Sequence, residues 1–391
     1  MTGPDDGRPL RVHFYASLAH PQGTYFRFHN LAVGLTRLGH RVTVYAADHN
    51  FRSHSRWETR DGVRYHVLAE SQFVRLFGHN CDLLTVLRRA ARQSPACDVA
   101  HLFQPFPSAA AAWLRADARV RFYDWDDLWT GGLMRGPVHR WRDLWPRWCV
   151  RYLEPRLPRW ADRVTVVGGF LADRARQAGA RDVSVIYNGV WPVAYLDRVE
   201  ARRQLGLQSG ALYAGFMGRT ADELPWCFDA LAENRDRHPA LRLAVCGAPE
   251  QLLQDLPPAV RERVDYLGQL TPEQTRAFAA ALDLGLLPLA DNPFNLSRFP
   301  IKFSEHLATG VPLLCSTVGE TGRLAPLFPW AIPAGTTRAE WVRAFGEAVE
   351  RVARGDAPRA DTRLFGEHLS WDGLSRRLAD SYRSALAATH D

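Results

Sequence analysis

The sequence of 391 residues has a single lysine, Lys302, although lysine and arginine together number 49. Where arginine supplies every other basic side chain of this kind, one retained lysine favours a position that needs a compact ammonium group rather than a planar guanidinium. Lys302 is therefore the first candidate for a ligand contact. The alternative interpretation is a surface lysine that is present by chance.

Paired cysteines and long apolar runs are also missing. The six cysteines are scattered without a Cys-x-x-Cys pair, and most lie in apolar runs, which is typical of reduced core thiols rather than of disulfides or a zinc site. No apolar run approaches the roughly 18 residues of a membrane-spanning helix, and residues 1–9 are polar and acidic, unlike a secretory leader. We therefore expect a cytoplasmic protein.

Composition and charge bound the class of protein and of partner. Apolar residues make up 46% of the chain and charged residues 23%, which is ordinary for a globular protein of two or three domains. The formal net charge of +7 favours anionic partners, whether nucleic acid, nucleotide or an anionic membrane surface. Charge alone does not choose among them.

Alternating apolar strands and helices begin at the N-terminus. A strand at 11–16, a helix at 28–38 closed by Gly39 and a strand at 41–46 form a βαβ unit, which predicts a Rossmann-like parallel sheet. The alternation continues with strands at 64–68, 98–103, 120–124, 163–167 and 183–186, and with helices at 82–93, 109–114 and 170–178.

A second α/β pattern follows a turn signal at Asn188-Gly189. Its predicted strands are 212–218, 241–246, 264–267, 283–287 and 311–315, and its predicted helices are 228–234, 272–282, 300–309, 338–353 and 370–387. We therefore predict one Rossmann-like domain over 1–189, a second over 190–368 and a closing helical segment over 369–391.

The segment from Phe299 to Arg323 contains the main candidate site. Pro300 can begin a helix and Gly310 can end it. Lys302 and Glu305 lie three residues apart, so one helical face could present a cation to a phosphate and a carboxylate to ribose hydroxyls. This pairing suits a nucleotide sugar.

A glycine-rich turn is predicted after the strand at 311–315. Gly319, Thr321 and Gly322 would place backbone N–H groups at the carboxyl end of that strand. An anionic group can approach such a turn without meeting a side chain. The segment as a whole therefore predicts a ligand site for a phosphorylated compound.

The motif Pro-x-Lys-x-x-Glu at 300–305, followed by Leu-Ala-x-Gly-x-Pro at 307–312, resembles the donor-site signature of nucleotide-sugar-dependent glycosyltransferases of the GT-B fold, in the large retaining class that includes family 4. In that class two acidic residues eight apart often frame the segment; here the second is Glu305 and the first position is Ser297. The resemblance covers nearly the whole chain. It implies two Rossmann-like domains facing a central cleft, with the acceptor bound by 1–189, the donor by 190–368, and the last helix packed back on the N-terminal domain.

The same resemblance implies roles for individual residues. The stretch Gly-Phe-Met-Gly-Arg at 215–219 resembles the family's Gly-Arg turn, whose arginine contacts the donor diphosphate; the lysine usual several residues later is absent, with Glu223 in that region. Arg219 and Lys302 would stabilise charge on the leaving diphosphate. The donor-binding residues would be Glu305, Gly218, Gly319, Glu320, Thr321 and Gly322.

Asp124, Asp126 and Asp127 form a carboxylate cluster where the strand at 120–124 ends. Such a cluster must be solvated, paired or bound to a cation. Three interpretations remain open: helix capping before Leu128, contact with a sugar or acceptor, and a metal site. In related enzymes this strand end often has a histidine that contacts the donor sugar. A subgroup with Tyr-Asp-x-Asp-Asp resembles the present sequence, which implies a catalytic place for Asp124 and a sugar or acceptor contact for Asp127.

Two further residues are candidates for acceptor or sugar contact. Gly23 lies in the first turn, where the family usually has Gly-Gly, and His101 lies near the end of a strand, on the side where open α/β sheets bind ligands. The alternative for His101 is a structural histidine with satisfied hydrogen bonds.

Residues 134–163 mix four tryptophans with eight arginines. Such a segment can lie at a membrane interface, with rings at headgroup depth and guanidinium groups on lipid phosphates. It can equally be an amphipathic helix that packs its tryptophans on the sheet. Peripheral contact with an anionic membrane is therefore one of two interpretations.

The expected function is transfer of a sugar from a UDP- or GDP-linked donor to a hydroxyl of a glycan or lipid-linked acceptor, with retention of configuration, in polysaccharide or glycoconjugate synthesis. No metal or other cofactor is expected, because Arg219 and Lys302 would supply the positive charge, and no nucleic acid partner is expected. The alternatives are a GT-B nucleotide-sugar epimerase and a non-catalytic basic module that binds polyanions or a membrane surface.

Overall fold

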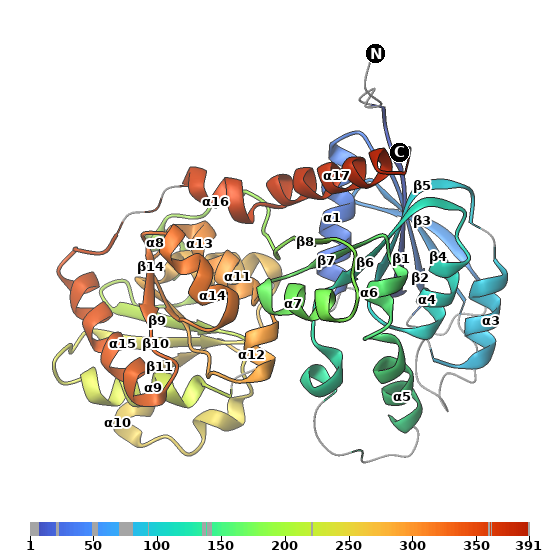
Figure 1. Cartoon of the computed structure of the whole chain (residues 1–391). Helices are drawn as coiled ribbons and strands as arrows, with labels where there is room; N and C mark the ends of the chain where they lie inside the picture. The colour runs from blue at the N-terminus through green and yellow to red at the C-terminus, as the bar shows by residue number, and fades with distance from the viewer. Residues whose placement is uncertain are drawn as a thin grey trace. The chain divides into compact units, whose positions relative to one another are not determined.

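The computed structural model describes residues 8–20, 23–48, 54–69, 81–92, 94–134, 138, 143–219, 222–358, 360 and 362–389. The chain divides into two compact units: unit 1 is Met1–Tyr187 with Trp371–Asp391, and unit 2 is Asn188–Ser370. Each unit contains its own sheet with helices around it (Figure 1). The domain junctions expected from the sequence, after residues 189 and 368, each lie two residues from the junctions of these units.

The sheet of unit 1 has eight strands in the order β3-β4-β2-β1-β5-β6-β7-β8. The parallel strands are β1 (Arg11–Leu18), β2 (Arg41–Ala47), β4 (Val63–Leu68), β5 (Cys97–Phe103), β6 (Ala118–Trp125), β7 (Arg163–Val166) and β8 (Val183–Val185), all of them predicted within a few residues. The edge strand β3 (Arg56–Arg60) pairs antiparallel with β4 and was not predicted. Its residues are partly or fully exposed and largely charged, so it has no apolar run to detect.

The helices of unit 1 are α1 (Tyr25–Arg37), α3 (Leu83–Ala91), α4 (Pro107–Leu114), the π-helical turn η1 (Trp129–Leu133), α5 (Leu144–Leu153), α6 (Leu157–Trp160), α7 (Gly169–Gln177) and α17 (Trp371–Ala387). Gln93, at the end of the helix expected over 82–93, lies outside the described residues, as do 135–137 and 139–142 of the Arg/Trp segment. In the described part of the chain, no helix is both long and apolar enough to span a membrane.

Helix α17 packs on α1 at a glycine. A Cβ atom added at Gly34 would overlap Ser375 Oγ and would lie 2.6 Å from Ser375 Cβ. We expect Gly34→Ala to lower the free energy of unfolding by about 1–3 kcal/mol, because overpacking a tight contact forces the two helices apart.

Denaturant titration measures this loss, and adding Ser375→Gly to Gly34→Ala should restore part of it. Gly210→Ala is the matched control, since a Cβ there has nothing within 4 Å. Equal stabilities of Gly34→Ala and the parent would contradict the packing described here.

The sheet of unit 2 is entirely parallel and has the order β11-β10-β9-β12-β13-β14. Its strands are β9 (Leu212–Met217), β10 (Leu241–Cys246), β11 (Val264–Tyr266), β12 (Leu284–Leu287), β13 (Leu313–Ser316) and β14 (Ala331–Ala334). Numbered along the chain, this is the 3-2-1-4-5-6 order of the Rossmann fold, in which the direction of winding reverses between β9 and β12. Ligands of such sheets bind at the carboxyl ends of the strands near that reversal.

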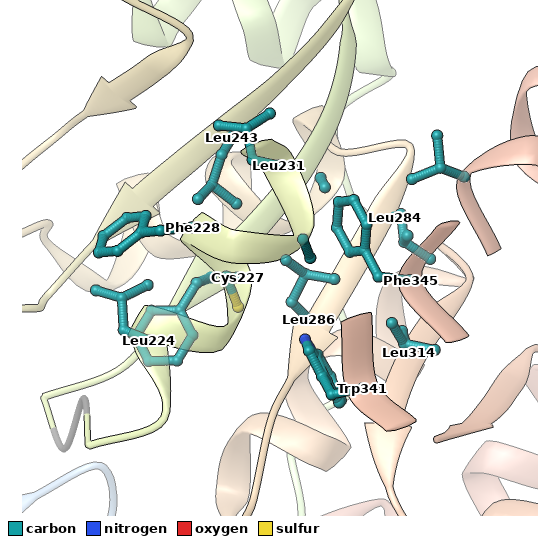
Figure 2. Packing of buried hydrophobic residues seen from close by; sticks show 14 of the residues in the cluster. Leu224, Cys227, Phe228, Leu231, Leu243, Leu284, Leu286, Leu314, Trp341 and Phe345 are labelled. Carbon is teal, nitrogen blue, oxygen red and sulfur yellow. The ribbon is translucent and has the colours of Figure 1, made fainter. Parts of the chain in front are cut away.

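The helices of unit 2 are α8 (Arg198–Leu205), α9 (Leu224–Asn234), η3 (Glu250–Leu253), α10 (Pro258–Arg261), α11 (Pro272–Ala281), α12 (Pro293–Ser297), α13 (Ile301–Thr309), α14 (Gly319–Leu324), η4 (Ala325–Leu327), α15 (Arg338–Ala353) and α16 (Thr362–Leu369). Figure 2 shows leucine and aromatic side chains of α9 and α15 packed against Leu243, Leu284, Leu286 and Leu314 of the strands. This core fixes the positions of the strands, and therefore the positions at which the loops at their carboxyl ends begin.

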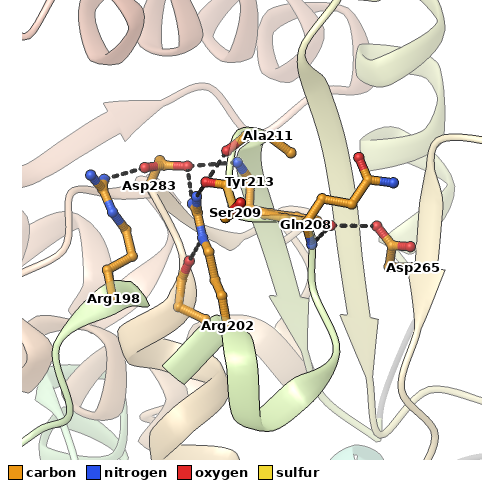
Figure 3. A network of polar contacts seen from close by, with 9 residues as sticks. Arg198, Arg202, Gln208, Ser209, Ala211, Tyr213, Asp265 and Asp283 are labelled. Atoms are coloured by element: carbon orange, nitrogen blue, oxygen red, sulfur yellow. Dashed lines mark hydrogen bonds and ion pairs between the residues drawn. The ribbon is translucent and has the colours of Figure 1, made fainter. Parts of the chain in front are cut away.

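A buried polar network ties the opposite, amino-terminal ends of the strands together (Figure 3). Arg202 of α8 donates to Ala281 O at 2.9 Å and to Asp283 Oδ2 at 2.5 Å. Asp283 precedes β12 and also accepts the N–H of Tyr213 in β9 at 2.7 Å. The network therefore stabilises the sheet without occupying the edge where a ligand would bind.

Candidate functional site

Glycine loops meet at the carboxyl ends of β9, β10 and β11 in unit 2. Gly218 follows β9, and its N–H donates to Cys246 O at 3.1 Å. Gly247 follows β10 with φ +80°, and a Cβ there would lie 3.2 Å from Gly218 O. Its N–H donates to Gly268 O at 2.8 Å. The predicted donor residue Gly218 thus lies where the backbones of two glycine loops approach each other closely, and Arg219 beside it is exposed.

Lys302 and Glu305 lie on the first turns of α13, as predicted from their spacing. The ammonium Nζ donates to Glu305 Oε2 at 2.6 Å, and the two side chains are 29% and 26% exposed. Burial raises the pKa of the Cys246 thiol at the end of β10 to about 12, and the nearby Lys302 and Glu305 charges act on this pKa in opposite directions. The pair therefore stands within electrostatic range of the carboxyl end of β10.

Helix α13 is held in this position from its other side. Ser304 Oγ donates to Asn188 O at 2.7 Å, and Asn188 Nδ2 donates to Phe299 O at 3.1 Å. The His306 ring packs on Gly285 of β12, where a Cβ would lie 2.6 Å from His306 Nδ1. Burial lowers the pKa of His306 to about 3, so this ring is neutral. These contacts leave Lys302 and Glu305 on the remaining face.

The prediction of a glycine-rich turn after β13 is wrong, because residues Gly319–Leu324 form the short helix α14. The N–H groups of Thr321 and Gly322 both point to Val318 O, at 3.1 and 3.4 Å, and Thr321 Oγ1 donates to Ser316 O at 2.7 Å. A Cβ at Gly322 would lie 3.0 Å from Thr317 O, so this glycine is needed for packing. The local sequence favours a turn because two of the six helical residues are glycines.

Two other residues of α14 were expected to bind the donor. Gly319 has φ +50°, and a Cβ there would lie 2.9 Å from Leu296 O, so the backbone approaches closely at this point. The Glu320 side chain is buried and its Oε1 accepts a hydrogen bond from Arg323 at 3.3 Å. Gly319 and Glu320 belong to the first turn of α14, where a helix presents its N–H groups.

Glu223 fixes the loop next to α14 and was not predicted to do so. Its Oε1 accepts the N–H of Ala290 at 3.0 Å and Nδ2 of Asn295 at 2.9 Å. Asn295 lies in α12, which is the helix that Gly319 approaches through Leu296. Glu223 therefore joins the start of α9 to the loop after β12. Its only sequence signal is its position in the region where the family usually has a lysine.

In unit 1 Asp124 forms a buried ion pair with Arg27 of α1. Arg27 Nε donates to Asp124 Oδ1 at 2.7 Å and Nη2 donates to Oδ2 at 2.8 Å, which is a bidentate geometry. Thr165 Oγ1 donates to Asp124 Oδ2 at 2.5 Å. The Asp124 side chain is 0% exposed. Both of its oxygens are thus engaged within unit 1, and a substrate contact of Asp124 stays a prediction.

His101 extends this network on the other side of Thr165. Its Nε2 is 3.1 Å from Thr165 Oγ1 and its Nδ1 is 2.6 Å from the hydroxyl of Tyr382 in α17. Burial lowers the pKa of His101 to about 3. Both ring nitrogens have partners, as expected for the structural histidine that was the alternative interpretation of the sequence. Contact of His101 with a sugar stays a prediction.

Glu154 accepts hydrogen bonds from N–H groups at and just after the end of β6. Its Oε1 accepts from Trp125 Nε1 at 3.0 Å and from the N–H of Trp129 at 2.7 Å, and its Oε2 accepts from the N–H of Thr130 at 2.8 Å. The backbone N–H groups of Trp129 and Thr130 lie at the start of η1, where the aspartates were one candidate for capping. The sequence could not indicate Glu154, because it lies 25 residues from Trp129 along the chain.

Asp126 and Gly23 lie at the carboxyl edge of the first sheet. Thr24 donates a side-chain hydrogen bond to Asp126, whose Oδ1 is buried without a hydrogen-bond partner. Gly23, with φ +56°, is exposed, and Asp127 is half-buried. At the end of β5, Gln104 has φ +73° and bonds Ser17 of β1. Strained backbone of this kind is concentrated at functional sites.

The pKa of Asp126 gives a testable pH dependence. Burial, with the nearby Asp124 charge acting the same way, raises this pKa from 3.8 to about 6. Between these values the folded state binds more protons than the unfolded state, so the contribution of Asp126 to stability falls as the pH rises from about 4 to about 6. We expect Asp126→Asn to remove this fall, as measured by denaturant unfolding across that range. Parallel curves for parent and variant would contradict the raised pKa.

Within the described residues, no group of three or more His, Cys, Asp or Glu side chains is arranged to hold a metal ion. All six cysteines are buried and none is in a disulfide. The predicted site residues thus fall into two sets. Gly218, Arg219, Lys302, Glu305 and 319–322 belong to unit 2, and Gly23, His101, Asp124 and Asp127 belong to unit 1.

Each half of the chain matches a glycosyltransferase family model. Residues 23–192 match the family model described as Glycosyltransferase Family 4, and residues 210–355 match the one described as Glycosyl transferases group 1. The putative teichuronic acid biosynthesis glycosyltransferase TuaH of Bacillus subtilis is 23% identical over 67% of this chain and 66% of its own length. The D-inositol 3-phosphate glycosyltransferase of Nocardia farcinica is 28% identical over 50% of this chain and 45% of its own. The chain therefore spans about half to two-thirds of the length of these relatives.

Solved structures share the fold over nearly the whole chain. Sucrose-phosphate synthase from Thermosynechococcus elongatus has a TM-score of 0.68 at 15% identity, covering 97% of this chain and 100% of that one. Anabaena HepE, in complex with UDP and glucose, has a TM-score of 0.64 at 15% identity, covering 96% and 100%. Together with the two sheets, these similarities show that the chain has the GT-B fold, with a first half that matches the family 4 glycosyltransferases and a second half that matches the group 1 glycosyltransferases.

Proposed function

We propose that the protein transfers a sugar from a nucleotide diphosphate donor to a hydroxyl of a glycan or lipid-linked acceptor. The observation on which this rests is the half-buried Lys302–Glu305 pair, which stands near the carboxyl end of β10 in a sheet of Rossmann order. The glycine loops after β9, β10 and β11 leave backbone at the same edge. This is where a nucleotide binds in sheets of this topology.

Each residue of the pair has a chemical part in the proposed reaction. The Lys302 ammonium, with the exposed guanidinium of Arg219, would stabilise the negative charge that grows on the diphosphate as the sugar leaves. Glu305 would accept hydrogen bonds from the ribose hydroxyls and, at 2.6 Å, orients the Lys302 ammonium. Transfer with retention of configuration is part of the proposal, as is a donor with UDP or GDP.

The named relatives support a role in cell-surface polysaccharide or glycoconjugate synthesis, since one is named for teichuronic acid biosynthesis and another for glycosylation of an inositol phosphate. The UDP in the HepE structure supports a uridine nucleotide as the first donor to test. We propose a cytoplasmic location, in keeping with six free, buried cysteines.

A panel of UDP- and GDP-sugars screened by thermal shift tests the donor. A ligand at about 100 times its dissociation constant stabilises the folded state by about 2.7 kcal/mol, which is a readily measured rise in Tm. The donor found in this way is then incubated with glycan and lipid-linked acceptors, and the anomeric configuration of the product is read by NMR. Turnover of the donor in the absence of any acceptor would instead identify an epimerase. Salt-sensitive binding of polyanions without any response to nucleotide sugars would identify a non-catalytic module.

We also expect transfer to continue after divalent ions are removed, because Lys302 and Arg219 supply the positive charge at the diphosphate. The measurement is the initial rate with the identified donor after dialysis against EDTA, compared with the rate after magnesium or manganese is added back. Loss of turnover in EDTA that either metal restores would assign a metal to the aspartates at 124–127 and overturn this expectation.

A further inference from the structure

Helix α3 has its polarity reversed. It buries Arg89, which is 3% exposed and donates to Ala16 O at 3.1 Å, Tyr45 O at 3.0 Å and Ser108 Oγ at 3.0 Å. Its leucines face outward instead: Leu83 is 67% exposed and Leu87 55%. A surface helix of a globular protein normally turns its leucines inward. The outward leucines therefore leave an apolar face that the described residues of unit 1 do not cover.

Helix α5 presents a second apolar surface. Trp145, Trp148 and Tyr152 are spaced by three and four residues, so they form one stripe along the helix. Their rings stack, Trp145 on Trp148 with centroids 5.3 Å apart and Trp148 on Tyr152 at 5.7 Å. All three are exposed, with Trp148 at 56%. Stacking between exposed rings makes the stripe a preformed surface rather than three independent side chains.

The two surfaces adjoin at the beginnings of their helices. Trp145 Nε1 donates to the carbonyl oxygen of Cys81, two residues before α3, at 2.7 Å. The buried thiols of Cys81 and Cys149 hydrogen-bond beneath them, which lowers the pKa of Cys149. The exposed leucines of α3 and the rings of α5 therefore belong to one connected region of unit 1.

The charge around this region is positive. Arg88 and Arg92 follow the leucines at the end of α3, and Arg147 and Arg151 alternate in the sequence with the aromatic residues of α5. Neither α3 nor α5 contains an aspartate or a glutamate; the N-cap Asp82 is buried and the N-cap Asp143 is exposed. Apolar and aromatic side chains can enter the acyl region of a bilayer, and arginines beside them can bind its anionic headgroups.

We propose that this lipid-facing surface, formed by Leu83, Leu84, Leu87, Trp145, Trp148 and Tyr152 with the arginines around them, docks unit 1 on an anionic membrane. It differs from the segment 134–163 that the sequence indicated, because half of its apolar side chains come from α3. A second copy of the chain fits less well: an isologous contact would bring the same arginines together, and like charges at an interface are unfavourable. The docking complements the proposed transfer to a lipid-linked acceptor but does not depend on it.

Flotation of the whole protein with lipid vesicles tests the proposal. The probes are vesicles of equal parts phosphatidylcholine and phosphatidylglycerol, and vesicles of phosphatidylcholine alone. We expect binding to the first at low salt, weaker binding to the second, and a loss of the difference as salt is raised. Replacing Arg88 and Arg151 by Gln should weaken binding to the anionic vesicles by about 30-fold, since each basic residue near such a surface contributes about a factor of five.

The apolar part has its own variant and control. Leu83→Ser, Leu87→Ser and Trp148→Ser together should weaken binding on the order of 100-fold, as expected for losing three interfacial anchors. The matched control for the apolar set is Val199→Ser with Leu252→Ser and Leu327→Ser. The control for the charges is Arg351→Gln with Arg376→Gln. All five residues are exposed outside the lipid-facing surface, so these variants should bind the vesicles as the parent does.

Circular dichroism and the Tm shift caused by the identified donor should be the same for the surface variants and the parent. This separates a failure to dock from a failure of the proposed donor site. The proposal is overturned if the parent does not float with anionic vesicles at low salt, or if both surface variants float as the parent does. It is also overturned if light scattering shows that the parent is a dimer which the serine variant makes monomeric, because the surface would then hold a second copy.

Discussion

Replacing Lys302 by methionine is expected to lower turnover of the true donor by about 100-fold or more, with a smaller effect on donor binding. The reason is that the attraction between the ammonium and the leaving diphosphate grows as charge develops, so its loss is felt mainly in the transition state. The Lys302–Glu305 pair is more than a quarter exposed, and pairs of that kind contribute only about 0–1 kcal/mol to stability. The variant should therefore fold, and steady-state kinetics with the identified donor can measure kcat and KM separately.

Two companion variants sharpen this test. Glu305→Gln keeps the shape but weakens an acceptor of ribose hydroxyls that is present in ground and transition states alike, so its defect should be mainly weaker donor binding, by about 1.5–3 kcal/mol. Lys302→Arg keeps the charge but changes its reach and geometry, and we expect a substantial loss of turnover. If both Lys302 variants turned over like the parent, the lone lysine would be an accident of composition and the proposed site would be refuted.

Breaking the buried pair between Arg27 and Asp124 is expected to have the largest effect on stability. Arg27→Met or Asp124→Asn each leaves a charge without its partner in a place with almost no solvent, and such losses cost about 3–5 kcal/mol. Denaturant titration of the two single variants and of the double variant measures the coupling. The double variant should lose less than the two single losses combined, because no unpaired charge remains.

The exposed pair of Arg176 and Asp173 is the matched control, since Arg176→Met should change stability by less than about 1 kcal/mol. The same variants also test the catalytic role predicted for Asp124. A well-folded Asp124→Asn protein that has lost turnover would show that this carboxylate acts on the substrate. Loss of stability with turnover retained in the folded fraction would show that Asp124 only positions β6 against α1.

The sequence predicted most of the fold because the strands that form the two sheets are short apolar runs followed by glycine or by helical patterns. Two described strands were missed: β3, whose residues alternate between partial and full exposure and form no apolar run, and β14, whose four residues include a proline that argues against a strand. The sequence of α14 predicts a turn, because two glycines in six residues have low helix propensity. Contacts with the backbone of Leu296 and Thr317 decide the conformation there, and they cannot be read from local sequence.

The candidate site was predictable to a different degree in each unit. The spacing of Lys302 and Glu305 placed them on one helical face, because the helix period alone decides that. The partner of Asp124 was not predictable, because Arg27 is 97 residues away in the chain and is one of 48 arginines. Glu154 was not predictable for the same reason. It lies at the end of α5 and accepts hydrogen bonds from the backbone N–H groups of Trp129 and Thr130 in the turn after β6.

The division of the chain also constrains the order in which the protein can be completed during synthesis. Unit 1 is built from residues 1–187 and from α17, whereas unit 2 is one continuous stretch between them. The ribosome therefore delivers all of unit 2 before Tyr382 can reach His101 and before Ser375 can reach Gly34. Until then, the face of α1 that α17 covers is open to solvent. A nascent chain that has made the whole second unit still has an unfinished first one, with an exposed surface for chaperones to protect.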